Sequence, residues 1–240
     1  ISGGFGKITL GQEDGAGDQL TRTAHDLVGP DALNDGGGAV KNGGNLADDN
    51  ADLIDDINDE NAITYMLPKM GGLTVGASFA DSGAVGSTDT TAFGFRYTTE
   101  AAGSSITIGG ATATTEATTT DKDSQNLGIK IVNGNLSFAL SQGTEEAADE
   151  DQEHTGAAIS YKMGNGMTIG AYTVDGEDTL DAGEEYTASG VEVQYTIASG
   201  LTAVIIVEDY EYKAPTTADA NGTTTGDSGT NSRLVIKASF

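Results

Sequence analysis

The sequence predicts an all-β fold, a transmembrane antiparallel β-barrel, and two patterns support this prediction. Apolar and polar residues alternate along short segments, which places them on opposite faces of a strand. Short turns also alternate with long polar loops, as expected when the two ends of a barrel face different compartments. A soluble β-sandwich shares the first pattern but has no reason to gather its short turns at one end. We therefore expect one barrel domain over residues 1–240.

The C-terminal segment shows the alternation most clearly. Leu234, Ile236 and Phe240 fall on one face, whereas Arg233 and Lys237 fall on the other. Twelve segments share this pattern and are predicted strands. They cover residues 5–12, 61–67, 71–80, 90–98, 103–111, 126–133, 135–141, 155–163, 166–174, 188–197, 200–209 and 233–240.

The connections between these segments differ in length in a regular way. Tight turns rich in Gly and Asn occur at residues 133–134, 164–166 and 198–200. Longer polar loops alternate with them, at residues 81–89, 112–125, 142–154, 175–187 and 210–232. The alternation predicts that all short turns lie at one end of the barrel and all long loops at the other.

Basic residues indicate which face of the barrel meets water. Those within the predicted strands all fall on the polar face: Lys7, Arg96, Lys130, Lys162, Arg233 and Lys237. Each Lys or Arg on the lipid face near mid-membrane would cost roughly 2–4 kcal/mol. The polar face should therefore line a water-filled interior. Val204 and Ile206 break this rule, and either a packed loop or a local bulge could cover them.

Charge and composition exclude several classes of protein. The chain has 11 Lys and Arg against 37 Asp and Glu, a formal net charge of -26, and no Cys. Nucleic-acid binding needs clustered cations and is disfavoured, whereas attraction of cations is expected. The two histidines, His25 and His154, lie far apart in predicted loops and outside any nucleophile or metalloprotease motif, so we do not expect an enzyme.

Four segments carry a resemblance to a known family: FGKITLGQ (residues 5–12), NAITYMLP (residues 61–68), GLTVGASFAD (residues 72–81) and the strand that ends in Phe240. Taken together over essentially the whole chain, they resemble the general diffusion porins of Gram-negative bacteria. FGKITLGQ (residues 5–12), a long loop and then NAITYMLP (residues 61–68) are similar to the strands on either side of that family's long third loop. The strand that ends in Phe240 looks like the family's terminal strand. The resemblance implies sixteen strands in the complete protein, with about twelve of them, the fifth to the sixteenth, in this chain. We accordingly expect N-terminal strands to be missing.

The resemblance also implies a function and a location. General porins are water-filled channels of the bacterial outer membrane, through which small hydrophilic solutes and ions diffuse passively. By analogy we expect a homotrimer in contact with outer-membrane lipid and lipopolysaccharide. Its long loops would be extracellular and its short turns periplasmic.

The loop at residues 13–60 is the predicted constriction. It is densely acidic, and the resemblance implies that it folds into the barrel and narrows it. Carboxylates there, opposite basic wall residues, would favour cations. The candidate acidic residues are Asp18, Asp26, Asp31, Asp35, Asp48, Asp49 and Asp52. The candidate wall cations are Lys7, Arg96, Lys130, Lys162 and Lys237. The alternative is a solvated acidic surface loop.

Calcium is a further hypothesis for the same loop. Asp48, Asn50 and Asp52 have the alternate spacing of oxygen ligands, but Leu53 and Asp59 stand where an EF-hand needs Gly and Glu. We expect no required cofactor, with incidental calcium left open.

An alternative function for the whole chain is a secreted or surface-layer β-protein that binds calcium through acidic loops. A sugar- or phosphate-specific channel is disfavoured by the few aromatic residues and by the negative charge.

Overall fold

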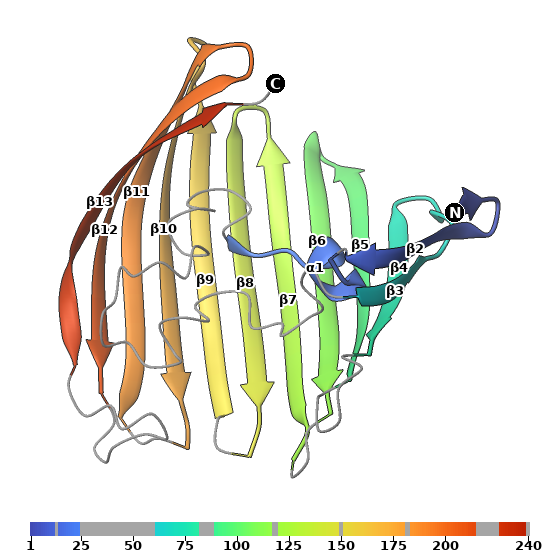
Figure 1. The fold of residues 1–240 in the computed structure, drawn as a ribbon. Coiled ribbons are helices and arrows are strands. Elements are labelled where there is room, and N and C mark those ends of the chain that lie inside the picture. The colour runs from blue at the N-terminus through green and yellow to red at the C-terminus, as the bar shows by residue number, and fades with distance from the viewer. Residues whose placement is uncertain are drawn as a thin grey trace.

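The described residues form thirteen strands in a single curved antiparallel sheet, in which each strand pairs with its neighbours in sequence (Figure 1). The computed structural model describes residues 1–12, 14–24, 61–81, 89–116, 120–148, 151–180, 183–214 and 226–238. The strands are β1 (Ser2–Gly3), β2 (Gly6–Gln12), β3 (Asn61–Met66), β4 (Leu73–Ala80), β5 (Thr90–Ala101), β6 (Ser104–Thr115), β7 (Lys122–Asn133), β8 (Leu136–Glu146), β9 (Asp151–Lys162), β10 (Met167–Asp178), β11 (Glu184–Ala198), β12 (Leu201–Lys213) and β13 (Asp227–Ala238). In the part of the chain that the structure describes, one short helix, α1 (Ala16–Leu20), follows β2.

The predicted all-β fold is confirmed, and each of the twelve predicted strands has a counterpart among β2 to β13. Most observed strands extend further toward the long loops than predicted, because polar alternation continues there after the apolar residues end. Among the described residues, no strand ladder joins β13 back to β1 or β2, so the sheet is a curved wall. The sixteen strands expected of the complete protein stay a prediction.

Short turns gather at one end of the sheet, at the top in Figure 1. Asn133 ends β7 and Leu136 begins β8, and Gly134 between them has a φ of 58°. Gly200, between β11 and β12, has a φ of 74°. These left-handed conformations favour glycine and permit tight hairpins. The predicted grouping of the short turns is confirmed by this arrangement.

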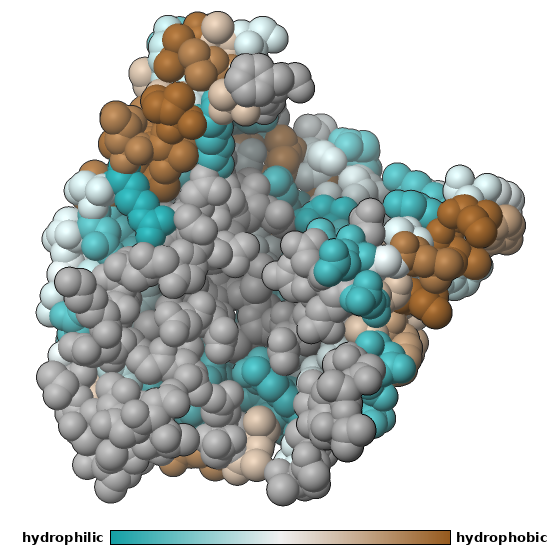
Figure 2. All heavy atoms as spheres, viewed as in Figure 1, coloured by the Kyte–Doolittle hydropathy of each residue, from teal (hydrophilic) through white to brown (hydrophobic). Residues whose placement is uncertain are grey.

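The two faces of the sheet differ in chemistry. We call the face on which α1 lies the inner face and the opposite one the outer face; α1 packs against β4, β5 and β6. Inner-face residues such as Ala92, Ala139 and Ser124 are buried. Outer-face residues such as Leu140 and Leu234 are 58% and 69% exposed. In Figure 2, brown hydrophobic surface accordingly shows mainly at the margins of the sheet, and teal surface shows between these margins.

The apolar surface of the outer face forms a band that ends before the strands do. On β10, outer-face Ile169 is followed by Asp175 and Glu177 toward the long loops. On β12, outer-face Ile205 and Val207 are followed by Asp209 and Glu211. Because charged side chains avoid hydrocarbon, the band fits a membrane and the strand ends beyond it fit water. No helix among the described residues is long and apolar enough to cross a membrane.

An arginine in the apolar band should oppose membrane insertion. We expect Leu140→Arg, on the outer face of β8, to make folding into lipid vesicles less favourable by roughly 2–4 kcal/mol. Gln142→Arg is a matched control, because Gln142 lies on the same face one pair of residues nearer the long loops. Its effect should be clearly smaller. Equal losses in urea titrations of the two variants would contradict the location of the band.

An inner-face cluster explains the two apolar residues that break the alternation. Val204 and Ile206 are each 2% exposed and belong to a buried cluster on the inner face. Ala24, from the segment that follows α1, packs in the same cluster. Residues 202–207 of β12 pair in unbroken register with both β11 and β13, so no bulge lies at Val204 or Ile206. Most of this cluster comes from inner-face side chains of β10 to β12, among them Tyr172, Tyr186 and Tyr212. A loop that covers Val204 and Ile206 stays a prediction.

Candidate functional site

The first part of the long acidic segment lies on the inner wall of the sheet. Residues 14–24 include α1, which packs on the inner face of β4 to β6, and continue across β7 to β8 (Figure 1). The backbone N–H of Ala16 donates to the hydroxyl of Ser78 at 2.9 Å. The N–H of Ala24 donates to the hydroxyl of Ser141 at 3.0 Å. Two wall serines therefore hold the two ends of this segment, which we call the wall-bound segment.

Arg96 holds the middle of the wall-bound segment. Its guanidinium donates to the carbonyl oxygen of Gln19, to that of Leu20 at 3.3 Å and to that of Thr21 at 3.5 Å. These carbonyls come at the end of α1, where a helix has oxygens without helical partners and a partial negative charge. A guanidinium satisfies several such oxygens at once because it carries five donors. Arg96 therefore acts as a structural clamp on the segment.

Glycines in the wall allow the segment to approach the strands closely. A Cβ atom on Gly94 would lie 2.6 Å from the carbonyl oxygen of Ala16. On Gly109 it would lie 2.4 Å from that of Leu20, and on Gly128 it would lie 1.8 Å from that of Arg22. Glycine weakens strand interiors, so its presence here indicates close backbone approach. Gly109 and Gly128 are direct cross-strand partners, which makes the seat continuous across β6 and β7.

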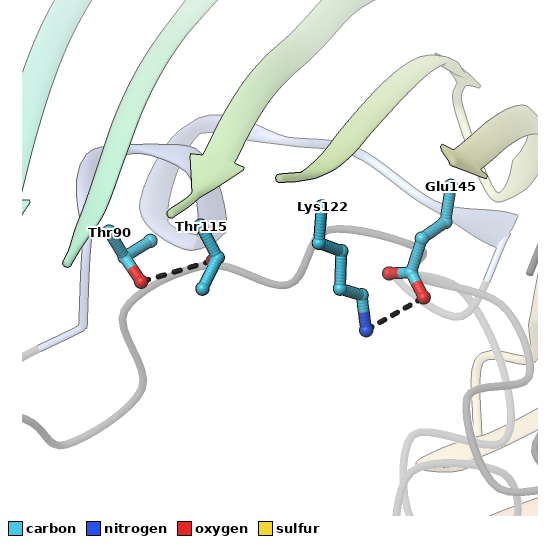
Figure 3. Close-up of polar contacts among 4 residues, drawn as sticks. All are labelled: Thr90, Thr115, Lys122 and Glu145. Atoms are coloured by element: carbon cyan, nitrogen blue, oxygen red, sulfur yellow. Dashed lines mark hydrogen bonds and ion pairs between the residues drawn. The ribbon is translucent and has the colours of Figure 1, made fainter. Parts of the chain in front are cut away.

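Polar contacts also line the inner face near the long loops. Lys122 on β7 pairs with Glu145 on β8 at 2.7 Å, and the hydroxyls of Thr90 and Thr115 lie 3.1 Å apart (Figure 3). The side chain of Glu145 is only 3% exposed. An opposite charge at this distance offsets part of the cost of burying the carboxylate. These contacts join neighbouring strands on the side that faces the wall-bound segment.

Tyrosine and carboxylate pairs hold the inner face of the later strands. The hydroxyl of Tyr172 donates to Glu208 at 2.5 Å, and that of Tyr212 donates to Glu184 at 2.8 Å. All four side chains are at least 96% buried. Hydrogen bonding makes such burial of polar groups tolerable. This part of the wall is therefore packed, whereas the wall of β4 to β8 carries the wall-bound segment.

The predicted wall cations lie where their alternation places them, on the inner face. Lys7, Lys130, Lys162 and Lys237 all occur near the short-turn ends of their strands. Arg96 lies near the middle of β5. They belong to different strands spread across the sheet, so the structure does not bring them into one cluster. Their role in ion selection stays a prediction.

Most of the predicted acidic residues cannot be placed. Asp18 is exposed on α1. Asp26, Asp31, Asp35, Asp48, Asp49 and Asp52 lie outside the described residues, as does Asn50 of the hypothetical calcium site. Among the described ranges, no group of three His, Asp or Glu side chains is arranged to hold a metal ion. The calcium hypothesis therefore stays a prediction about a part of the chain that the structure does not describe.

The residues that seat the wall-bound segment are not among the sites predicted from the sequence. In the sequence, Ser78, Ser141 and the wall glycines are small residues at alternate positions of the predicted strands, with nothing to single them out. A signal was present in the alternation, because Gly76, Gly94 and Gly128 occupy inner-face positions where a water-facing wall could carry larger polar side chains. Only the register of the strands shows that such positions adjoin one another.

Two surface grooves lie on the outer face, outside the candidate channel. One, of about 570 Å³, is lined by outer-face side chains that include Phe93, Phe95 and Leu127. The other, of about 530 Å³, is lined by residues that include Ile108, Ile129 and Leu140. Both occur where small residues interrupt the apolar band. They belong to the lipid-facing surface and not to the pore.

Comparison with known proteins identifies the family. Residues 1–215 match the family of Gram-negative porins. No curated protein matches the sequence significantly. Several solved structures share the fold, and these are outer-membrane porins.

The anion-selective porin from Comamonas acidovorans has 17% identity and a TM-score of 0.66, with 100% of this chain and 76% of that chain covered. Outer-membrane-expressed OmpT of Vibrio cholerae has 13% identity and a TM-score of 0.63, covering 97% and 76%. OccAB4 of Acinetobacter baumannii has 14% identity and a TM-score of 0.60, covering 74% and 52%. The chain thus spans about half the length of OccAB4.

The fold and the family match agree with the division of the sheet into an apolar outer face and a polar inner face. A barrel with that division belongs in a bilayer whose proteins span it with strands. The match covers most of the chain and includes the wall-bound segment. The chain belongs to the family of Gram-negative porins of the bacterial outer membrane.

Proposed function

We propose that the protein forms a water-filled channel through which small hydrophilic solutes and ions diffuse passively, with a preference for cations. The observation that carries this proposal is the wall-bound segment, which lies on the polar inner face of a sheet whose outer face is apolar. A segment inside a barrel narrows its lumen, and a narrow lumen makes the charges on its lining effective in selection. A channel of this kind is not expected to catalyse a reaction.

Cation preference rests on the excess of carboxylates. The formal net charge is -26, and the loop at residues 13–60 contributes many of the acids. A similar fold is compatible with the opposite preference, since the Comamonas acidovorans relative is an anion-selective porin. At 17% identity that relative informs us about the fold and not about the lining charges. Charge placement in the lumen must therefore decide selectivity.

Removing acids from the proposed constriction should weaken cation preference. In planar bilayers with a KCl gradient, we expect Asp26→Asn, Asp31→Asn and Asp35→Asn together to move the reversal potential toward zero. The physical reason is that fewer fixed carboxylates enrich cations less in the lumen. Asp18→Asn, on the wall-bound segment, should act in the same direction.

The matched control removes three acids from the outer face. Asp175→Asn, Glu177→Gln and Asp209→Asn change net charge equally but lie outside the barrel wall. This triple variant should leave the reversal potential nearly unchanged. Equal shifts in the two triple variants would show that net charge alone matters and would remove the loop acids from the constriction. No ion conductance by the wild-type protein would overturn the channel itself.

We also propose, by analogy within the family, that the assembled protein is a homotrimer in contact with outer-membrane lipid and lipopolysaccharide. Exposed apolar residues of β13, Leu234 and Ile236, are available for packing against a neighbour. Chemical crosslinking in detergent, followed by mass measurement, tests this assembly. A monomeric mass throughout would contradict it.

A further inference from the structure

Charges on the inner face are segregated along the axis of the barrel. Near the short turns, the described residues place four lysines and one carboxylate, Glu100, on this face. The lysines are Lys7, Lys130, Lys162 and Lys237. Lys7, Lys162 and Lys237 are exposed, and Lys130 is half-buried. The short-turn mouth therefore has a basic lining in this part of the chain.

The opposite mouth has the opposite lining. Near the long loops, the described inner-face residues include four carboxylates and one lysine, Lys122. The carboxylates belong to Glu145, Asp178, Glu184 and Asp227. Between the two mouths the described inner-face charges balance. The middle carries Arg96, Arg233, Glu192 and Glu208.

The assignment of these residues to one face comes from strand register. Lys130 pairs with Thr107 and Ala139, which occupy the inner face with Gly109 and Ser141. Lys237 pairs with Thr202, in step with Val204 and Ile206 of the inner cluster. Because successive side chains alternate, each lysine points to the side on which α1 lies. The segregation thus follows from backbone pairing and does not depend on lysine rotamers.

We propose that the short-turn mouth collects multivalent oxyanions of the phosphate class, and that the opposed charges of the two mouths make the open channel rectify ion current. This inference rests on the proposed channel function. Basic rings in a pore attract anions, and a wall of low dielectric constant strengthens their field. A phosphate carries more charge than chloride, so it should occupy the basic mouth preferentially.

The direction of rectification follows from which ions each mouth enriches. The acidic mouth near the long loops holds excess cations, and the basic mouth near the short turns holds excess anions. A potential that is positive on the long-loop side drives both populations into the channel, which raises its conductance. The reverse potential draws both out and lowers the conductance. Current should therefore be larger when the long-loop side is positive.

The test needs channels of known orientation. The chain has no Cys, so Gly164→Cys supplies a single thiol in the short turn between β9 and β10, where a Cβ meets nothing within 4 Å. A bulky membrane-impermeant thiol reagent reacts with this Cys only when it is added on the side of the bilayer that the short turns face. The side on which it reacts therefore identifies the short-turn mouth. In about 0.1 M KCl, where the Debye length is about 10 Å, we expect roughly twofold rectification. In about 1 M KCl, where it is about 3 Å, rectification should largely disappear.

Inorganic phosphate is the second probe. Added on the short-turn side in low salt, it should lower the current, and added on the long-loop side at the same concentration it should have a much smaller effect. The double variant Lys130→Gln and Lys162→Gln should lose both the rectification and the block by phosphate. The control Lys213→Gln removes an exposed lysine from the outer face near the long loops, where it pairs with Glu185 at 2.6 Å. This control should keep both properties.

The outcomes separate this inference from the proposed function. Conducting channels with symmetrical currents, or with larger current at the opposite polarity, would overturn the inference and leave the channel in place. Equal phosphate block from both sides would overturn the basic mouth as the anion site. Loss of block in Lys213→Gln to the same extent as in the double lysine variant would show a general effect of charge and would also overturn it. Absence of conductance would instead contradict the proposed function.

Discussion

Gly128→Ala is expected to narrow the channel and to destabilise the barrel. The added Cβ would lie 1.8 Å from the carbonyl oxygen of Arg22, so the wall-bound segment must move away from β7. The strand occupies one side of this contact, and the segment can therefore move only toward the lumen. We expect a lower single-channel conductance in planar bilayers. Overpacking of this kind also costs roughly 1–3 kcal/mol, measurable as a lower urea midpoint in detergent.

A second wall glycine, Gly94, provides a weaker version of the same test, and a turn glycine, Gly164, provides its control. Gly94→Ala should act in the same direction but less strongly, because its Cβ would lie 2.6 Å from the carbonyl oxygen of Ala16. Gly164→Ala is the control, since a Cβ there meets nothing within 4 Å. It should leave conductance and stability unchanged. Wild-type conductance in Gly128→Ala would show that the segment does not limit the channel at this point.

Replacing Arg96 by methionine is expected to release the middle of the wall-bound segment. Methionine keeps much of the side-chain length but cannot donate to the carbonyl oxygens of Gln19, Leu20 and Thr21. Leu20 and Thr21 are buried, and a buried carbonyl without a partner costs roughly 1–3 kcal/mol. We expect a lower urea midpoint and larger current fluctuations in the open channel, because the segment is then held mainly at Ser78 and Ser141.

Arg96→Lys separates the clamp from the charge. Lysine keeps the positive charge but lacks the planar fork that reaches several carbonyls at once. If Arg96 acts mainly as a clamp, the lysine variant should show fluctuations close to those of Arg96→Met while its reversal potential stays near wild type. Lys213→Met is the matched control, because Lys213 is an exposed cation on the outer face, away from the wall-bound segment, and its loss should leave the current fluctuations unchanged. Quiet wild-type currents in Arg96→Lys would contradict the clamp.

The strands could be predicted from the sequence because their signal is local. Alternation of side chains determines which residues share a face, and Gly or Asn at tight turns determines where a hairpin forms. Ile129 and Leu140 could therefore be assigned to the outer face before the register was known. The far ends of the strands were harder to predict, because beyond the apolar band both faces are polar. In β10, outer-face Asp175 and Glu177 alternate with inner-face Gly176 and Asp178 and give no contrast in hydropathy.

The seat of the wall-bound segment could not be predicted in the same way. Gly128 and Arg22 are far apart in sequence, and their contact depends on how a long loop returns to the wall. Arg96 was correctly assigned to the inner face, but its carbonyl partners belong to a helix that the sequence analysis did not predict. Val204 and Ile206 looked anomalous for a related reason, since they are buried in a cluster whose other members, such as Tyr172 and Tyr186, come from other strands.

By itself the sequence determined the β-barrel fold class, the faces of the strands and the sign of the overall charge. All three follow from alternation along single strands or from composition, and none of them needs knowledge of contacts between distant residues. Only the tertiary structure decided which wall the acidic segment rests on, which glycines admit it and how charges are ordered from one mouth to the other. These features depend on the register between strands and on the path by which a long loop comes back to the wall. Both are set by contacts between residues far apart in sequence, which a local pattern does not contain.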